Sequence, residues 1–232
     1  MDLGEADLFS ILDDHKKQND LTVTKILFFW EEILHCLKAV HDRNIIHFDV
    51  KPENFIRWSI YNNDVNNKLT YISTPFRVAG QMKIIDFGLA RQINNSEDKL
   101  ISSNPMPGTY HYVAPENFRL LHANGEFVSD LELDDDDDRG DTHVQLTLKA
   151  DIWSIGIILY KMVYGLHPYA AVSGGRVSKI FSLKSFTEIE FATLQYEKDR
   201  SKILLRSLKA SLRKDPKERE NSEKLLSMMT SV

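Results

Sequence analysis

Apolar residues recur at intervals of three and four positions across residues 24–44, which predicts a helix with one buried face. The regularity ends at Asp42, where polar residues follow, and Pro52 interrupts the chain a few residues later. A loop is therefore expected after a rigid helix. The apolar positions of this helix are Ile26, Leu27, Trp30, Ile33, Leu34, Leu37 and Val40.

Three later segments also have helical patterns. Residues 150–164 are almost wholly apolar and are followed by Gly165, which is typical of a helix buried on most sides. Residues 204–212 and 222–229 show the periodicity of two further amphipathic helices. The chain is therefore predicted to be mostly α.

The remaining segments are short strands or irregular. Two apolar runs, 55–58 and 82–85, are predicted to form a β-hairpin with a long polar connection. Residues 94–108 and 120–148 follow neither period and are expected to be irregular. The second of these contains five consecutive aspartates and is expected to be an acidic, disordered insert.

The composition is that of an ordinary globular domain, with 42% hydrophobic and 27% charged residues among 232. The net charge of −5 comes from the insert. Without its seven acids, which are Asp130, Glu132 and the five aspartates 134–138, the net charge of the chain would be +2. Direct binding of nucleic acid is therefore not expected. No apolar run is long enough for a membrane span, so a cytoplasmic or nuclear protein is the expectation.

Simple metal and thiol sites find little support in the sequence. Cys36 is the only cysteine, which excludes a disulfide framework or a cysteine-based zinc site within this chain, and it is interpreted as a core residue. The aspartate run fails as a calcium loop. Arg139 stands where the loop glycine belongs, and Gln145 where the bidentate glutamate belongs.

One short loop, residues 47–54, carries groups suited to phosphoryl transfer. That reaction requires a carboxylate at the attacking hydroxyl, oxygen ligands for magnesium and a cation on the phosphates. Asp49 would accept the hydroxyl proton, Lys51 would neutralise the moving phosphoryl group, and Asn54 would offer an amide oxygen to a metal. The sequence therefore predicts a catalytic loop.

A second metal-binding group follows the predicted hairpin. Asp86 comes directly after an apolar strand, and Gly88 allows the backbone to turn sharply. Asn54 and Asp86 together are predicted to bind Mg²⁺.

These motifs occur in one order, and the chain after them continues with Gly108-Thr109, Ala114-Pro115-Glu116, Asp151-Ile152-Trp153-Ser154-Ile155-Gly156 and Arg219. In this order and spacing the sequence resembles the eukaryotic protein kinase family over nearly its whole length. The resemblance implies a protein-kinase-like fold, present as its C-terminal helical lobe with a short catalytic-loop β-hairpin. It also implies an enzyme that uses ATP and Mg²⁺ to phosphorylate protein hydroxyls.

A narrower resemblance is to the monopolar-spindle type of dual-specificity kinases. It is carried by residues 1–8, Phe29-Trp30, Asn54-Phe55, Gly108-Thr109 with Tyr112, 187–191 and 212–219. It implies Ser/Thr or dual specificity, protein substrates, and a place in the cytoplasm or nucleus that includes the kinetochore.

The family resemblance also implies contacts with ATP. Asp2 and Leu3 resemble the hinge backbone that meets adenine, and Ile56 resembles the floor of the adenine pocket. Ile85 resembles the apolar residue before the metal ligand, and Lys51 would contact the phosphates.

Three further roles follow from the same resemblance. Thr109 would contact both Asp49 and Lys51 as part of the catalytic site. Asp151 resembles the acid that holds the catalytic-loop backbone. Arg219 resembles the partner of Glu116 in a buried ion pair.

The resemblance divides the chain into the end of a hinge (1–8), a catalytic loop (45–54), an activation segment (86–116), the acidic insert (120–148) and a helical subdomain (149–232). Neither a Gly-rich loop nor a strand lysine precedes Met1, so the N-terminal β-rich lobe is expected to be absent, through truncation or an incomplete gene model. Little activity is then expected of the chain alone. The alternative to an enzyme is a non-catalytic scaffold derived from a kinase.

One residue of the predicted catalytic loop departs from the family pattern. Phe48 stands where kinases usually carry an arginine.

Overall fold

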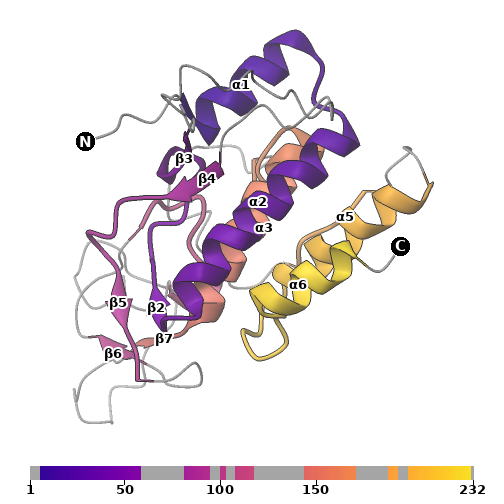
Figure 1. Ribbon diagram of the computed structural model, residues 1–232. Coiled ribbons are helices and arrows are strands. Elements are labelled where there is room, and N and C mark those ends of the chain that lie inside the picture. Colours follow the sequence, from indigo (N-terminus) through magenta and orange to yellow (C-terminus); the bar gives the residue numbers. More distant parts are fainter. Residues whose placement is uncertain are drawn as a thin grey trace, which may run out of the picture.

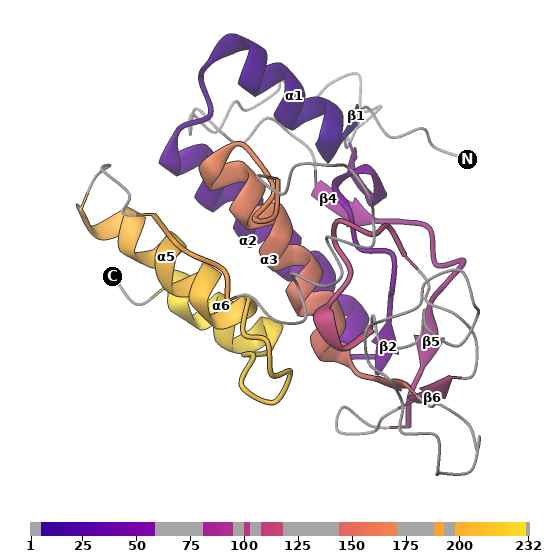
Figure 2. The ribbon, with the colours of Figure 1, turned by 180° about the vertical axis from the view of Figure 1, so that it is seen from behind.

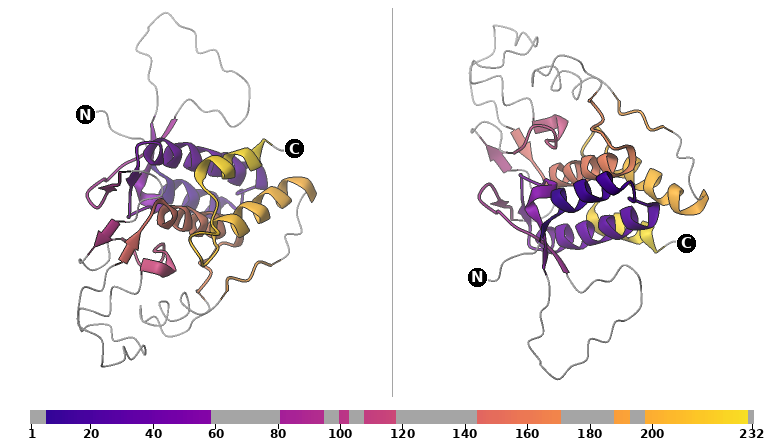
Figure 3. Two further views of the ribbon diagram at one scale, coloured as in Figure 1. Left: turned by 90° about the horizontal axis from the view of Figure 1, so that it is seen from below. Right: turned by 90° about the horizontal axis from the view of Figure 1, so that it is seen from above.

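The computed structural model describes seven segments of the chain, and its long helices lie together on one side of the short strands (Figures 1 and 3). The described residues are 6–58, 81–94, 100–102, 108–117, 144–170, 188–192 and 198–230. Among them, no helix combines the length and apolar character needed to cross a membrane.

Two helices form the centre of the fold. α2 (Val23–His41) packs against α3 (Leu148–Tyr164), and both contact β2 (Ile45–Ile46). Trp30 and Trp153 are fully buried in this core. The side chain of Thr22 caps the start of α2, and Gly165, at a φ of 76°, ends α3. Both predicted helices are confirmed, and their long apolar faces pack against each other.

α5 (Lys198–Ser211) and α6 (Ser222–Met229) cover one side of this pair (Figures 1 and 2). α5 packs on α3 and α6 packs on α2. Both helices were predicted, although α5 begins before the expected start at residue 204.

α1 (Leu8–Gln18) was not predicted from the sequence. It lies across the end of the central pair at which α2 begins (Figures 1 and 2). The Asp7 side chain accepts the Ser10 N–H at 2.7 Å and caps its start, and Asn19, at a φ of 51°, ends it. The apolar residues of this helix are confined to its first half, so the sequence shows no sustained period.

The predicted hairpin forms part of a three-stranded antiparallel sheet. β1 (Ala6–Asp7), β3 (Phe55–Trp58) and β4 (Gln81–Ile84) lie in the order β1-β3-β4. Phe55 is opposite Ile84, so Ile85 lies just beyond the strand that was expected to contain it. β2 pairs with β5 (Arg91–Gln92), and the predicted catalytic loop, residues 45–54, begins with β2 and ends with the 3₁₀ turn η1 (Pro52–Asn54).

Parts of the two segments that were expected to be irregular form short strands. β6 (Leu100–Ser102) pairs with β7 (Val144–Leu146), so Ile101 lies opposite Gln145. The end of the predicted disordered insert is therefore a strand followed by the start of α3 at Leu148. Strands of three residues are too short to show an alternating pattern in the sequence. The aspartate run lies outside the described residues.

Cys36 lies on α2 against the hairpin, as expected of a packing residue. Its thiol donates to the Met82 carbonyl at 3.1 Å. Burial, followed by the negative charge of Glu32, raises the pKa of Cys36 to about 12. The thiolate needed of a nucleophile is therefore scarce at neutral pH.

We expect the Cys36 thiol to react with a thiol reagent at pH 8 on the order of a thousandfold more slowly in the folded protein than in denaturant, because an ordinary cysteine has a pKa of about 8.5. Reaction rates measured with and without guanidinium test this. Similar rates in the two states would show that Cys36 is not buried as described.

Candidate active site

Asp151, in the first turn of α3, anchors the backbone of the catalytic loop. Its buried carboxylate accepts hydrogen bonds from the backbone N–H of His47 at 2.8 Å and of Phe48 at 3.0 Å. The His41 ring contacts the same carboxylate at 3.0 Å. Phe48 has a φ of 68°, which non-glycine residues rarely adopt. Asp151 therefore holds the loop in a conformation that the chain would otherwise avoid.

The carboxylate of Asp49 is fully engaged. Its Oδ1 accepts from the backbone N–H of Thr109 at 3.1 Å and from the Thr109 hydroxyl at 3.0 Å. Its Oδ2 contacts Lys51 Nζ at 2.5 Å and Asn54 Nδ2 at 3.3 Å. Because a carboxylate offers about four lone-pair positions, an incoming hydroxyl would have to replace one of these donors.

The pKa of Asp49 lies below the usual carboxyl value. Burial is the largest single influence and opposes the charge. The hydrogen bond and positive charge of Lys51 outweigh it, with help from Thr109 and Asn54. Asp49 is therefore ionised at neutral pH and is a weak base. Such a group is better suited to orienting a hydroxyl than to removing its proton early.

Thr109 lies against the predicted catalytic loop. Its hydroxyl lies 3.3 Å from Lys51 Nζ as well as 3.0 Å from Asp49. The preceding Gly108 has a φ of 119°, and a Cβ there would lie 2.6 Å from the Phe48 carbonyl oxygen. A glycine is therefore needed for this close approach.

Asn54 and Asp86 have oxygens suited to a metal ion. The Ile85 N–H donates to the Asn54 carbonyl at 2.9 Å, which ties the two segments together. Asn54 uses its amide N–H group on Asp49, so its side-chain oxygen has no donor among the described residues. Asp86 is exposed, and one of its oxygens accepts the Gly88 N–H at 3.3 Å. These hard oxygen ligands fit Mg²⁺.

His47 connects the catalytic loop to the Asp86 segment and is fully buried. Its Nδ1 accepts the Asp49 N–H at 3.3 Å, and its Nε2 faces the Ile85 carbonyl at 2.9 Å. A neutral ring protonated at Nε2 satisfies both contacts. The ring of Phe87 packs on it with centroids 4.9 Å apart. His47 is thus a scaffold residue.

The residues predicted to meet adenine are described only in part. Asp2 and Leu3 lie outside the described residues. Ile56 is half-buried in β3, and Ile85 is 40% exposed. Phe87 is 45% exposed. Exposed apolar side chains therefore precede and follow Asp86 in the chain.

Phe48 replaces the arginine that kinases usually carry, and its side chain packs rather than binds. It is buried with Ile46, Ile93 and Leu148 in a small apolar cluster. The nearby Arg91 guanidinium donates to the carbonyls of Leu89 and Ala90 at 3.2 and 2.9 Å.

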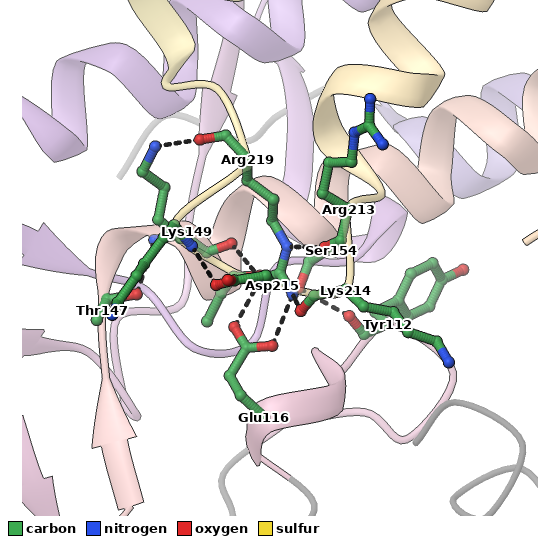
Figure 4. A network of polar contacts seen from close by, with 11 residues as sticks. Tyr112, Glu116, Thr147, Lys149, Ser154, Arg213, Lys214, Asp215 and Arg219 are labelled. Carbon is green, nitrogen blue, oxygen red and sulfur yellow. Dashed lines mark hydrogen bonds and ion pairs between the residues drawn. The ribbon is translucent and has the colours of Figure 1, made fainter. Parts of the chain in front are cut away.

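A buried ion pair joins Glu116 to Arg219, which lies between α5 and α6 (Figure 4). Arg219 is 1% exposed and meets both carboxylate oxygens of Glu116, at 2.6 and 2.7 Å. Its remaining N–H groups donate to the carbonyls of Arg213, Lys149 and Lys214 at 2.6, 3.0 and 2.9 Å. All five N–H donors of the guanidinium are therefore used.

Comparison with known proteins bears directly on this site. A model of the protein kinase domain matches residues 1–229. The chain belongs to the protein kinase family. Its similarity to Serine/threonine-protein kinase mph1 of Schizosaccharomyces pombe is 34% identity over 170 residues, which are 73% of this chain and 20% of that protein.

Two further kinase relatives match almost the whole chain. Dual specificity protein kinase TTK of Mus musculus is 29% identical over 227 residues, 97% of this chain and 22% of that protein. Serine/threonine-protein kinase MPS1 of Saccharomyces cerevisiae is 26% identical over 230 residues, 98% of this chain and 26% of that protein. The narrower resemblance to this kinase type is confirmed. The chain spans about a fifth to a quarter of the length of these relatives.

In this kinase the structure brings Asp49, Lys51, Thr109 and Asn54 into direct contact, while Asp86 is tied to Asn54 through the backbone. Sequence reasoning missed one supporting residue, His41, which contacts Asp151 from 110 positions away. A histidine at the end of a helix gives no sign of so distant a partner. The expected absence of the N-terminal lobe stays a prediction.

Proposed function

We propose that this chain carries the phosphoryl-transfer site of a Ser/Thr or dual-specificity protein kinase of the monopolar-spindle type. The observation that carries this proposal is the convergence of Lys51, Thr109 and Asn54 on the carboxylate of Asp49. Its cofactors are ATP and Mg²⁺, and its substrates are proteins.

In the proposed reaction, Asp49 orients the hydroxyl of the protein substrate. The Thr109 hydroxyl already occupies a position 3.0 Å from Asp49 and 3.3 Å from Lys51. A substrate hydroxyl that replaces this contact would meet the same carboxylate and cation. Asp49 then accepts the proton as the new bond to phosphorus forms, and Lys51 offsets the charge of the phosphoryl group.

The nucleotide side of the site uses the oxygens left free in the structure. Magnesium-ATP, when bound, supplies the phosphoryl group and neutralises its negative charge. Asn54 and Asp86 would hold the metal through their unoccupied oxygens. Ile56 and Ile85 would contact adenine, together with the backbone of residues 2–3.

The remaining assignments follow the family resemblance. We propose that the end of the hinge is at 1–8, the catalytic loop at 45–54, the activation segment at 86–116, the acidic insert at 120–148 and the helical subdomain at 149–232. From the family resemblance alone, we also propose that the protein acts in the cytoplasm or nucleus, including the kinetochore.

The metal assignment is tested by replacing Asp86 with asparagine in the natural polypeptide that carries this chain. We expect the Mg²⁺ concentration for half-maximal phosphotransfer to rise by about tenfold or more, because one charged ligand is lost. Initial rates over a magnesium series measure this. Asp14→Asn, an exposed residue on α1, is the matched control.

Unchanged magnesium dependence in Asp86→Asn would remove Asp86 from the metal site. A kinase-derived scaffold would give no metal-dependent transfer in any variant, so the same series separates the two functions.

A further inference from the structure

A cavity of about 810 Å³ lies beside α1, between the turn that leads into α2 and the last turn of α3. In Figures 1 and 2, α1 lies across the end of the α2–α3 pair at this place. Cavities of roughly 300–1,000 Å³ are typical of binding sites for ligands and side chains. None of the roles proposed above uses this space, which is called the α1 cavity below.

The walls of the α1 cavity are largely apolar. Phe9, Leu12, Leu21, Val23, Met162 and Val163 contribute to them. Phe9 is 43% exposed, although large apolar residues are usually covered. The cavity is therefore suited to apolar side chains of a partner.

The two acids in the cavity wall are already neutralised. Asp13 pairs with Lys17 at 2.7 Å. Asp20 contacts both Lys25 and His15 at 2.6 Å, and these two contacts lower the pKa of Asp20. Neither acid therefore offers an uncompensated charge to a ligand.

Three cations at the same place, Lys16, Lys161 and Arg200, have no carboxylate partner among the described residues. Lys16 and Lys161 line the cavity, and in the described part of the chain neither contacts a carboxylate. The Lys161 ammonium lies 5.2 Å from the centre of the Phe9 ring. Arg200 of α5 donates to the neutral hydroxyl of Thr24, another cavity residue, at 2.9 Å. The rim therefore carries a surplus of positive charge.

We propose that the α1 cavity docks an acidic peptide segment with apolar side chains, supplied by a protein substrate. This proposal rests on the proposed kinase function. Apolar side chains of the segment would fill the cavity, and its carboxylates would face Lys16, Lys161 and Arg200. A basic segment would meet those same cations and be repelled.

The position of the cavity suits a substrate-docking role. Pro52 forms part of its wall and directly follows Lys51 in the catalytic loop. A segment held here is thus close to the loop that orients the phosphoacceptor. Docking of this kind raises the effective concentration of a linked hydroxyl at the site.

The test is binding of a fluorescein-labelled probe peptide, Glu-Leu-Glu-Phe-Glu-Leu-Glu, to the 232-residue chain by fluorescence anisotropy. We expect saturable binding that weakens about tenfold in the double variant Lys16→Glu/Lys161→Glu, since two partly exposed charge pairs are lost and reversed. Lys209→Glu, an exposed change on α5 away from the cavity, is the matched control and should bind as the parent does.

A charge swap makes the test specific. A second probe with lysine at each glutamate position should bind the double variant more tightly than it binds the parent chain. The proposal is overturned if the two probes bind the parent equally, if no saturable binding occurs, or if Lys209→Glu weakens binding as much as the double variant.

Folding and function are controlled separately. Circular dichroism checks that the double variant is folded, and the single variant Lys16→Glu provides a milder change at an exposed position. No nucleotide is present in the assay. Its outcome is therefore independent of whether the chain transfers phosphate, and failure of one proposal is distinguishable from failure of the other.

Discussion

Replacing Arg219 with alanine is expected to lower the free energy of unfolding by about 3–5 kcal/mol. Arg219 is almost completely buried, and its guanidinium satisfies both oxygens of Glu116 and three backbone carbonyls. Removing it leaves the Glu116 carboxylate and those carbonyls without their donors. Urea unfolding followed by circular dichroism measures the loss.

Two controls separate the ion pair from general sensitivity. Arg219→Lys keeps the charge but cannot form the two-pronged contact with Glu116, so it should also be clearly destabilised. Lys38→Ala removes the exposed pair with Asp42 on α2 and should leave unfolding unchanged within error. If Arg219→Ala is as stable as the parent, the buried network of Figure 4 does not support the fold.

Replacing Asp49 with asparagine is expected to lower kcat for phosphotransfer by about 10²–10⁴-fold. The amide keeps the shape of the side chain but loses the charge that orients and deprotonates the hydroxyl. Lys51 also loses its ionised partner, which lies 2.5 Å from its ammonium nitrogen in the parent structure. Steady-state kinetics of the natural polypeptide, with the parent and the variant compared at saturating ATP, measure the effect.

The matched control for Asp49 is Asp42→Asn, which changes an exposed acid at the end of α2. It should leave kcat unchanged, and the unfolding transition of Asp49→Asn should show that the protein remains folded. A kcat within a few-fold of the parent would mean that Asp49 does not orient the attacking hydroxyl.

The sequence predicted the parts of the fold that have long periodic patterns. α2 and α3 contain enough apolar positions to define a buried face, so their existence and approximate ends could be read directly. α1 could not be predicted in this way, because only its first half is apolar and it packs on η1, β1 and β3. The β6–β7 pair depends on two short segments that are distant in sequence.

The candidate site also has features that could be predicted from the sequence and features that could not. The family resemblance predicted that Thr109 would contact Asp49 and Lys51, and these side chains are in contact. The family resemblance also anticipated the role of Asp151. Sequence could not show that four donors fill the Asp49 carboxylate, because that depends on packing distances.

Phe48 illustrates how a departure from the family pattern is accommodated. A φ of 68° is unusual for phenylalanine. The backbone N–H groups of His47 and Phe48 both donate to the Asp151 carboxylate, and these hydrogen bonds help to hold Phe48 in this conformation. The side chain then enters an apolar cluster where an arginine would have no place. Neither the strained backbone nor the cluster is visible in the sequence.

The most direct test of the central claim is transfer of labelled γ-phosphate from ATP to protein by the natural polypeptide, with and without Mg²⁺. We expect labelled serine or threonine only when the metal is present, and almost none with Asp49→Asn under the same conditions. Equal labelling by the parent and Asp49→Asn would contradict it.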